Sequence, residues 1–314
     1  MKAIVCTKYG PPEVLQLAEV EKPAPKNNEV LIKVHATAVT ASDTIVRGFK
    51  LSRWSLLGVM MGLALGWNKP RKPILGMVVA GEVEAVGENV ERFQAGDLIY
   101  GSTLTSNKIQ FGAYAEYLCL PEDALIAAKP ASLSFEEAAA IPYGAGLALF
   151  FLKKANIQRG QKVLIYGASG AIGTAAVQIA RYFGATVTGV CSTTNLELVK
   201  SLGADAVIDY TKEDAADHLE RYDVVFDAVG EAKSSDLKER SRNALTPSAV
   251  YLSVDKGSPQ TLPEDLVLLN EMIEAGQMKA VIDRSYPLEQ MVEAHRYVDQ
   301  GHKKGNLIIA VAQA

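Results

Sequence analysis

The chain has 314 residues, 48% of them hydrophobic and 22% charged, which predicts about two folded domains and excludes a disordered protein. With 32 basic and 36 acidic residues, the chain as a whole has no positive field that would draw it to nucleic acid or to an anionic membrane. Its three cysteines, Cys6, Cys119 and Cys191, fit neither a disulfide framework nor a metal knuckle, which favours a reducing, cytoplasmic setting.

The first third of the chain has the pattern of short strands joined by turns. Runs that are rich in β-branched residues or alternate in polarity are bounded by Gly, Pro and Asn. They lie at 2–8, 29–39, 78–87, 96–102 and 113–121. Together they predict a barrel-like, all-β unit. Residues 54–67 are strongly apolar, but about 14 residues are too few to span a bilayer, so no stable membrane insertion is expected.

From about Leu125 onward, helical and extended patterns alternate. Helices are predicted at 134–155, 173–184 and 196–203, and strands at 162–167, 185–191, 206–210 and 222–230. This alternation is typical of βαβ units and a parallel sheet. Helices at 263–276 and 288–298 and a strand at 305–312 follow. We therefore expect a first domain of 1–124, completed by 258–314, and an inserted α/β domain of 125–257.

A glycine-rich loop, GASGAIG, joins the strand at 162–167 to the helix that follows it. Its glycines are Gly167, Gly170 and Gly173, and Ala168 stands where the usual dinucleotide fingerprint has its first glycine. Glycine at 170 would let backbone N–H groups approach a pyrophosphate, and the helix N-terminus would supply unpaired donors. The alternative is an ordinary tight turn between a strand and a helix.

The end of the second α/β strand bears on which dinucleotide would bind. An NAD site carries Asp or Glu at this point to bind the ribose 2′-hydroxyl. Residues 191–195 read CSTTN and contain no acidic group. Hydroxyls and an amide would donate to a 2′-phosphate, so NADPH is favoured over NADH. Ser192 and Thr193 could equally cap the next helix.

These segments together resemble the medium-chain dehydrogenase/reductase superfamily, and within it the zinc-free quinone oxidoreductase branch, the zeta-crystallin-like proteins. The matching segments run in the family's order along nearly the whole chain, from GPPEVLQL through ILGMVVAGEVEAVGENVERFQAGDLIYG and VLIYGASGAIG to VIDRSYPLEQMVEAHRYVDQGHKKGNLIIAV. The resemblance implies an α/β fold. A GroES-like, β-barrel-type catalytic domain would be joined to a Rossmann domain, a doubly wound parallel sheet, with the active site in the cleft between them.

The resemblance also implies that no metal is bound. Thr40, Met77 and Ile141 stand at or near the positions where zinc-dependent relatives carry their ligands, and none of the three can bind zinc as a thiolate or an imidazole does. The four-cysteine lobe of those relatives is also missing between Gly101 and Gly112. Without a Lewis acid, hydride transfer to a quinone or to the β-carbon of an enone is the expected chemistry.

Site residues follow from the resemblance one at a time. Thr40 and Tyr143 are the polar groups expected to orient a substrate carbonyl. Each hydroxyl could instead satisfy only a backbone group. Asp43 either holds a helix N-terminus or takes part in the chemistry. A surface or structural role is expected for all four histidines. The residues expected to contact the cofactor are Ala168, Ser169, Gly170, Ala171, Ile172, Gly173, Ser192, Thr193, Tyr210, Val229, Gly230, Leu252 and Ser253.

Three features depart from the family pattern. The apolar segment 54–67 is long, and three interpretations remain open: a buried packing element, a hydrophobic lid over the substrate, or an interfacial membrane contact. Lys50 stands near the position at which some relatives carry a tyrosine that contacts the cofactor. Before Pro263 the chain lacks about 30 residues that relatives usually carry, including an edge strand through which many of them dimerise. A homodimer is therefore possible, but the resemblance does not imply it.

The leading hypothesis is therefore an NADPH-dependent, zinc-independent oxidoreductase acting on a small apolar quinone or α,β-unsaturated carbonyl. A zinc-free alcohol or aldehyde oxidoreductase is the second hypothesis. A non-catalytic NADPH-binding sensor or scaffold protein is the third. Fold alone does not decide between them.

Overall fold

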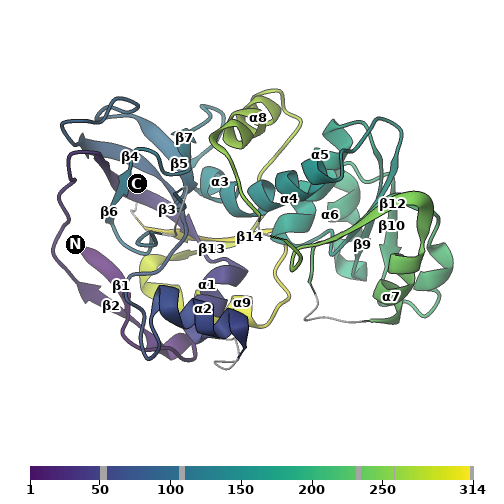
Figure 1. Ribbon diagram of the computed structural model, residues 1–314, viewed down its shortest axis with the longest axis horizontal. Coiled ribbons are helices and arrows are strands. Elements are labelled where there is room, and N and C mark those ends of the chain that lie inside the picture. Colours follow the sequence, from purple (N-terminus) through teal and green to yellow (C-terminus); the bar gives the residue numbers. More distant parts are fainter. Residues whose placement is uncertain (50–54, 106–109, 231–234, 258, 312–314) are drawn as a thin grey trace. The chain divides into compact units, whose positions relative to one another are not determined.

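The computed structural model describes residues 1–49, 55–105, 110–230, 235–257 and 259–311 (Figure 1). The chain divides into two compact units, Met1–Pro142 with Ile282–Ala314 and Tyr143–Val281. Residues 125–142 and 258–281 thus fall in the opposite unit from the one in which the sequence pattern places them. The first of these segments contains α3 (Phe135–Ala139), which packs on strands of the first unit. The second contains α8 (Pro263–Glu274), which is tied to the second unit by the Lys153–Asp265 ion pair.

The first unit is built on a seven-stranded sheet with β3 at its centre. The sheet order is β13-β14-β3-β4-β5-β7, and β6 also pairs with β3. Every pair is antiparallel except β13 with β14. The strands are β3 (Glu29–Ala38), β4 (Val78–Val86), β5 (Leu98–Ser102), β6 (Tyr117–Pro121), β7 (Ile126–Ala128), β13 (Ile282–Pro287) and β14 (Asn306–Ala310).

A separate ribbon and several helices complete the first unit. Strands β1 (Lys2–Cys6) and β2 (Leu15–Glu19) pair with each other, joined through the short helix η1 (Pro12–Val14). The helices are α1 (Ala41–Gly48), α2 (Leu56–Leu65), α3, η4 (Leu288–Gln290) and α9 (Met291–Asp299). The five strands predicted in the first third all form. The strands β2, β7 and β13 were not predicted.

The helix predicted over 134–155 is in fact two helices, which is a correction. α3 ends at Ala139, and α4 (Pro142–Lys154) begins at Pro142. Proline has no N–H to donate to the preceding turn, so a helix cannot pass through it undisturbed, whereas the first position of a helix accepts it. The boundary between the two units falls directly after this proline.

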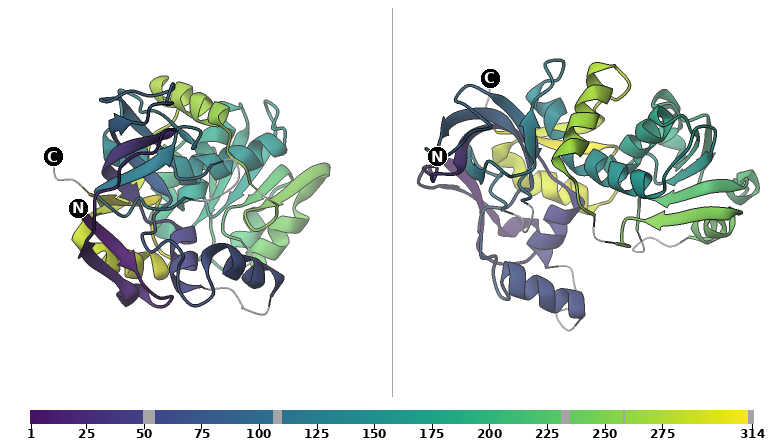
Figure 2. Two further views of the ribbon diagram at one scale, coloured as in Figure 1. Left: turned by 60° about the vertical axis from the view of Figure 1, so that its left-hand side comes forward. Right: turned by 45° about the horizontal axis from the view of Figure 1, so that its top comes forward.

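The second unit contains a five-stranded, fully parallel sheet in the order β10-β9-β8-β11-β12. Its strands are β8 (Lys162–Tyr166), β9 (Thr186–Cys191), β10 (Ala206–Asp209), β11 (Tyr222–Asp227) and β12 (Leu245–Ser253). The helices are α4, α5 (Ala171–Tyr182), η2 (Thr193–Asn195), α6 (Leu196–Ser201), η3 (Ala215–His218), α7 (Asp236–Asn243) and α8. Figures 1 and 2 show α5 and α7 on opposite faces of the sheet, as in a doubly wound fold.

The strand order reverses between β8 and β11. From β8 the chain runs outward through β9 to β10, and then continues on the other side of β8 as β11 and β12. In open α/β sheets, ligands bind beyond the carboxyl ends of the strands at this switch point. The turns that follow β8 and β11 are therefore where a ligand of this unit is expected. No helix in the described ranges is long and apolar enough to cross a membrane.

Candidate functional site

The predicted glycine loop forms the turn between β8 and α5, at the switch point of the sheet. Gly167 has φ +83°, and a Cβ at this position would lie 2.3 Å from Val229 Cγ2. A Cβ at Gly173 would lie 2.1 Å from the carbonyl oxygen of Gly167. Both glycines are therefore required by packing within the chain itself, whatever ligand is bound.

Gly170 is different, because no described residue crowds it. A Cβ there would have only the Gly167 oxygen within 4 Å, at 3.6 Å. Gly170 is also the N-cap of α5, and no side-chain hydrogen bond caps the helix. Open space beside a glycine and free N–H donors at a helix N-terminus are what a pyrophosphate requires. These residues fit the phosphates of a dinucleotide.

The residues around Gly170 are mostly buried or half-buried. Ala168, Ala171 and Gly173 are buried, and the side chains of Ser169 and Ile172 are half-buried. The side chain of Ala168 therefore packs inside the fold, so that position contributes backbone rather than side chain to the turn.

A group of hydroxyls and one amide lies at the carboxyl end of β9. Asn195 Nδ2 donates to Ser169 Oγ and to Ser192 Oγ, both at 3.1 Å. Asn195 is 8% exposed, and its Oδ1 accepts no hydrogen bond from the described residues. The amide thus links the glycine loop to the end of β9. Ser192 forms no side-chain cap of the helix that follows. Sequence reasoning placed Ser169 and Ser192 here but missed the role of Asn195.

A carboxylate that sequence reasoning missed lies beside Thr193. Asp209, at the end of β10, accepts hydrogen bonds from Thr193 Oγ1 and from Thr211 Oγ1. Burial opposes ionisation of Asp209, but the hydrogen bonds from these threonines outweigh it, and the pKa of Asp209 lies below its usual value. The end of β9 therefore does have a negative charge nearby. Tyr210, the next residue, is 51% exposed, so its ring is available to a ligand.

The turn after β11 is held in place by a buried aspartate. Asp227 is completely buried, and its Oδ1 accepts hydrogen bonds from the N–H groups of Val229 and Gly230, both at 3.1 Å. Its Oδ2 lies 2.8 Å from Nζ of Lys238, which is 1% exposed. The ion pair fixes the backbone of the two residues predicted to approach the ribose and nicotinamide.

Two residues of β12 complete this buried network. Tyr251 OH donates to Asp227 Oδ2 at 3.1 Å and accepts from Arg242 Nε at 3.1 Å. Ser253, predicted to contact the cofactor, is 1% exposed and donates to Asp227 Oδ2 at 3.3 Å. Leu252 is buried as well, with 7% exposure. The hydroxyl of Ser253 is thus already committed to the network that positions the turn.

Thr40 lies in the first unit, where it caps helix α1. Its Oγ1 donates to Asp43 Oδ2 at 2.6 Å and accepts from Asp43 N at 3.1 Å, while Thr40 N donates to the same carboxylate. This capping box confirms that Asp43 holds a helix N-terminus. Burial raises the pKa of Asp43 to about 6, against the opposing effect of these hydrogen bonds. To donate to a substrate carbonyl, Thr40 would have to give up its bond to Asp43.

The other candidate groups are placed as follows. Tyr143 lies in the first turn of α4, in the second unit, and is half-buried. Lys50 lies outside the described residues, as do 106–109, part of the segment where a four-cysteine lobe was expected to be missing. Met77 and Ile141 are buried, with 6% and 1% exposure. No group of three or more His, Cys, Asp or Glu able to hold a metal is found in the described ranges.

Comparison with known protein families gives matches over most of the chain. Residues 26–130 match the alcohol dehydrogenase GroES-like domain. Residues 171–266 and 248–309 match two models described as zinc-binding dehydrogenase. The positions of Thr40, Met77 and Ile141 do not supply zinc ligands of the thiolate or imidazole kind, so the description does not fit the donor groups present.

Individual relatives are similar over nearly the whole chain. The chain is 36% identical to the 2-methylene-furan-3-one reductase of Solanum lycopersicum, over 98% of this chain and 79% of the relative. It is 32% identical to the chloroplastic NADPH-dependent alkenal/one oxidoreductase of Arabidopsis thaliana, over 98% of this chain and 79% of the relative.

Solved structures agree with this similarity. A quinone oxidoreductase from Coxiella burnetii has a TM-score of 0.81 and 27% identity, covering 99% of both chains. A structure described as an NAD-dependent alcohol dehydrogenase has a TM-score of 0.84 and 28% identity, covering 99% of this chain and 100% of the other. The predicted fold class, a GroES-like unit with a doubly wound Rossmann unit, is confirmed.

Proposed function

Because the chain belongs to the medium-chain dehydrogenase/reductase superfamily, in its quinone oxidoreductase branch, we propose that it transfers hydride from NADPH to a quinone or to an α,β-unsaturated carbonyl. Membership makes it an NAD(P)H-dependent oxidoreductase. The observation that carries the cofactor assignment is the uncapped N-terminus of α5 beside the open face of Gly170, at the switch point of the sheet.

The class of acceptor is supported by the side chains at the positions where zinc-dependent relatives carry their ligands. Thr40, Met77 and Ile141 offer no group that would hold a Lewis acid against a simple ketone. A conjugated acceptor needs less polarisation, because the developing negative charge spreads over the whole system. The relatives named for reduction of quinones and of alkenals and enones have acceptors of this kind.

The residues of the chain act by binding and orienting. The N–H groups of α5 hold the pyrophosphate, and the turn at Val229 and Gly230, fixed by Asp227, supports the ribose and nicotinamide. When bound, the reduced nicotinamide supplies the hydride. Thr40 and Tyr143 are proposed to orient the carbonyl of the acceptor.

We propose NADPH rather than NADH, with Asp209 moderating the preference. No acidic residue lies among 191–195, and the hydroxyl of Ser192, which accepts from Asn195 Nδ2, can donate to a 2′-phosphate. The name of the Arabidopsis relative supports the same cofactor. Asp209 opposes it, because its carboxylate bonds to Thr193. A cytoplasmic location is also proposed, since Cys6, Cys119 and Cys191 are all free.

One observation favours a second candidate function. The similar structure described as an NAD-dependent alcohol dehydrogenase suggests alcohol or aldehyde turnover instead. Fluorescence titration with NADPH and NADH, followed by NADPH oxidation assays with a quinone, an enone and a saturated aldehyde, separates the candidates. Turnover of the first two acceptors supports the proposal. Turnover of the aldehyde alone supports the second candidate, and NADPH binding without any turnover indicates a non-catalytic binding protein.

The role proposed for Tyr143 can be tested by removing its hydroxyl. We expect Tyr143→Phe to lower kcat by about 10²-fold, the range for loss of one hydrogen-bond donor to the reacting carbonyl oxygen, and to leave NADPH affinity unchanged. Tyr182→Phe, on an exposed side chain of the same unit, is the matched control. Unchanged kcat in Tyr143→Phe would show that the Tyr143 hydroxyl does not orient the acceptor carbonyl.

A further inference from the structure

Helix α2 is apolar on all sides but only partly covered. All ten of its residues, LLGVMMGLAL, are apolar or glycine. Met60 is 58% exposed and Leu63 is 59% exposed, and Trp67, just beyond the helix, is 39% exposed. A helix that is hydrophobic all round is normally buried in a core or in a membrane. Within the part of the chain that the structure describes, the outer face of α2 therefore lacks the cover that its composition calls for.

The inner face and the end of α2 are firmly attached to the first unit. Met61 and Leu65 pack against its hydrophobic core. Tyr9 OH lies 3.1 Å from the Leu65 carbonyl oxygen and 2.9 Å from that of Gly66, and Arg71 N donates to the Leu65 oxygen at 2.7 Å. The helix lies at the rim of its unit (Figures 1 and 2). The exposed apolar face is thus a fixed feature of the fold.

The ring of Trp67 lies against α2 itself. A Cβ built on Gly62 would come within 2.8 Å of its ring atoms, so the glycine makes room for the indole. With Met60 and Leu63, Trp67 forms the outer apolar surface of this region, which we call the α2 face. Tryptophan is enriched where an apolar phase meets water, because its ring is apolar and its N–H is polar.

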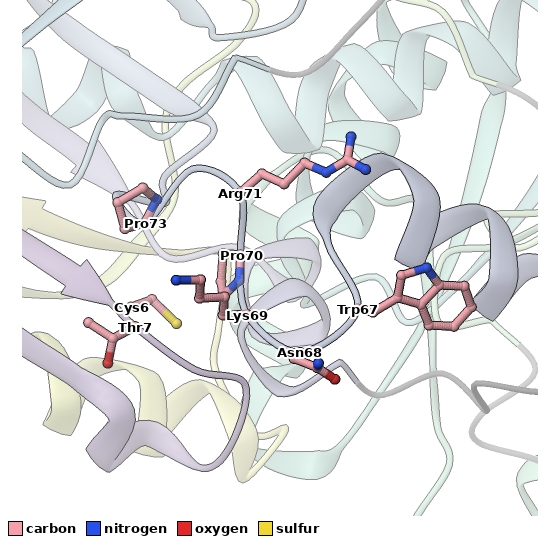
Figure 3. A pocket seen from close by; sticks show the side chains of 8 residues that line it. All are labelled: Cys6, Thr7, Trp67, Asn68, Lys69, Pro70, Arg71 and Pro73. Atoms are coloured by element: carbon pink, nitrogen blue, oxygen red, sulfur yellow. The ribbon is translucent and has the colours of Figure 1, made fainter.

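The segment around α2 is strongly basic in an acidic protein. Residues 44–81 contain six basic residues and no acidic one, which leaves 26 basic and 36 acidic residues in the rest of the chain. Two of the six, Lys69 and Arg71, are exposed and form no ion pair within the described ranges. They line a cavity of about 440 Å³ that also includes Trp67 and Cys6 (Figure 3). Free cations and an apolar surface lie together here.

We propose that the α2 face docks on the surface of an anionic phospholipid bilayer. Met60, Leu63 and Trp67 would enter the boundary between headgroups and acyl chains, and Lys69 and Arg71 would contact lipid phosphates. Ten helical residues extend only about 15 Å, so α2 lies in the interface and does not span it. A second copy of this chain fits the surface less well, because a symmetric contact would bring two basic segments together.

Docking would also bring the enzyme to the phase in which an apolar quinone dissolves. This consequence rests on the proposed function, whereas the docking itself does not. A protein that binds vesicles but reduces neither a quinone nor an enone would support docking of the α2 face and contradict only the proposed function. Turnover of a water-soluble quinone without any vesicle binding would support the proposed function and contradict docking of the α2 face.

The test uses the chain's two tryptophans, Trp54 and Trp67, which flank α2. Their fluorescence therefore reports on this segment alone. The full chain is mixed with vesicles of phosphatidylcholine, with or without phosphatidylserine, and followed by sedimentation and emission. We expect sedimentation and a blue shift with phosphatidylserine, and quenching by brominated acyl chains. Trp54→Phe, which leaves Trp67 as the only probe, should keep the shift. The absence of binding to phosphatidylserine vesicles would overturn the proposal.

Variants locate the contact. The Lys69→Gln/Arg71→Gln pair should weaken vesicle binding about 25-fold, about fivefold for each charge removed near an anionic surface. Met60→Gln/Leu63→Gln should weaken it at least about tenfold. Leu262→Gln/Val267→Gln, equally exposed on the second unit, is the matched control and should bind normally. Unfolding temperatures show that the variants are folded.

Two further results would contradict the proposal. Binding that survives Met60→Gln/Leu63→Gln would place the contact elsewhere on the chain. A dimer that this pair converts to a monomer in analytical ultracentrifugation, together with failure to bind vesicles, would identify a second copy as the occupant of the α2 face.

Discussion

Two glycines at the start of α5 have different roles that can be measured separately. Gly173→Ala would place a methyl group 2.1 Å from a backbone oxygen, so we expect it to reduce the free energy of unfolding by about 1–3 kcal/mol. Gly170→Ala meets nothing closer than 3.6 Å, so its stability should stay within about 0.5 kcal/mol of wild type. Urea denaturation measures both effects. The Gly170 variant should nevertheless bind NADPH about tenfold more weakly, since its methyl group takes the space meant for phosphate. Unchanged NADPH affinity would show that the pyrophosphate binds elsewhere.

Asp209 is the residue expected to limit the preference for NADPH. Asp209→Asn removes a negative charge near the proposed 2′-phosphate position, so the Kd for NADPH should fall about fivefold, corresponding to about 1 kcal/mol. The Kd for NADH should change much less. Fluorescence titration gives both constants. Asp217→Asn removes an exposed charge from the same unit and serves as the control. Equal changes in the Kd for NADPH and for NADH would show that Asp209 does not lie near the 2′-phosphate.

Asp43 gives the protein a pH dependence with a definite sign. Its pKa is raised to about 6 by burial, so the folded chain takes up a proton at a higher pH than the unfolded chain does. The stability from this proton is fully present below the ordinary pKa and is lost as the pH rises through about 6. When the pH is lowered from about 7 to about 4.5, the free energy of unfolding of wild type should rise by on the order of 2 kcal/mol relative to that of Asp43→Asn. Denaturation curves of both proteins at the two pH values measure this gain, and a constant difference would contradict it.

At the scale of elements, helix α7 supports the ligand-facing turn of β11 through one buried ion pair. Lys238→Met would leave Asp227 charged and unpaired in the interior, at a cost of about 3–5 kcal/mol. Affinity for the dinucleotide should fall too, because Asp227 holds the N–H groups of Val229 and Gly230. Thermal unfolding measures the loss of stability, and NADPH titration measures the loss of affinity. Lys200→Met, in an exposed pair with Glu197, should change neither. A stable variant with normal affinity would show that α7 does not support the turn.

The same elements show what a sequence can and cannot reveal. The strand, glycine turn and helix of residues 162–184 are contiguous, so their pattern predicted the turn and the uncapped α5. Asp209 meets Thr193 across neighbouring strands, and Asp227 meets Lys238 and Tyr251 from three different elements. Contacts of this kind depend on sheet order, which no local pattern contains. The break at Pro142, in contrast, had a local signal in the proline itself.

At the scale of the whole molecule, the order of motifs along the chain was enough to predict a β-rich unit and a parallel α/β unit. The limits of the units were harder to predict, because they depend on which sheet α3 and α8 pack against. Residues 54–67 were recognised as apolar, yet only the structure separates the inner face of α2 from the exposed face with Met60 and Leu63. When every position of a helix is apolar, its hydrophobic periodicity does not indicate which face is buried.

The most direct test of the proposed function follows the hydride itself. NADPH carrying deuterium at the transferable position of the nicotinamide is incubated with the protein and an enone, and the product is examined by NMR. We expect deuterium on the β-carbon of a saturated ketone. Deuterium on the carbonyl carbon of an allylic alcohol would contradict the proposed function and point to alcohol dehydrogenase chemistry.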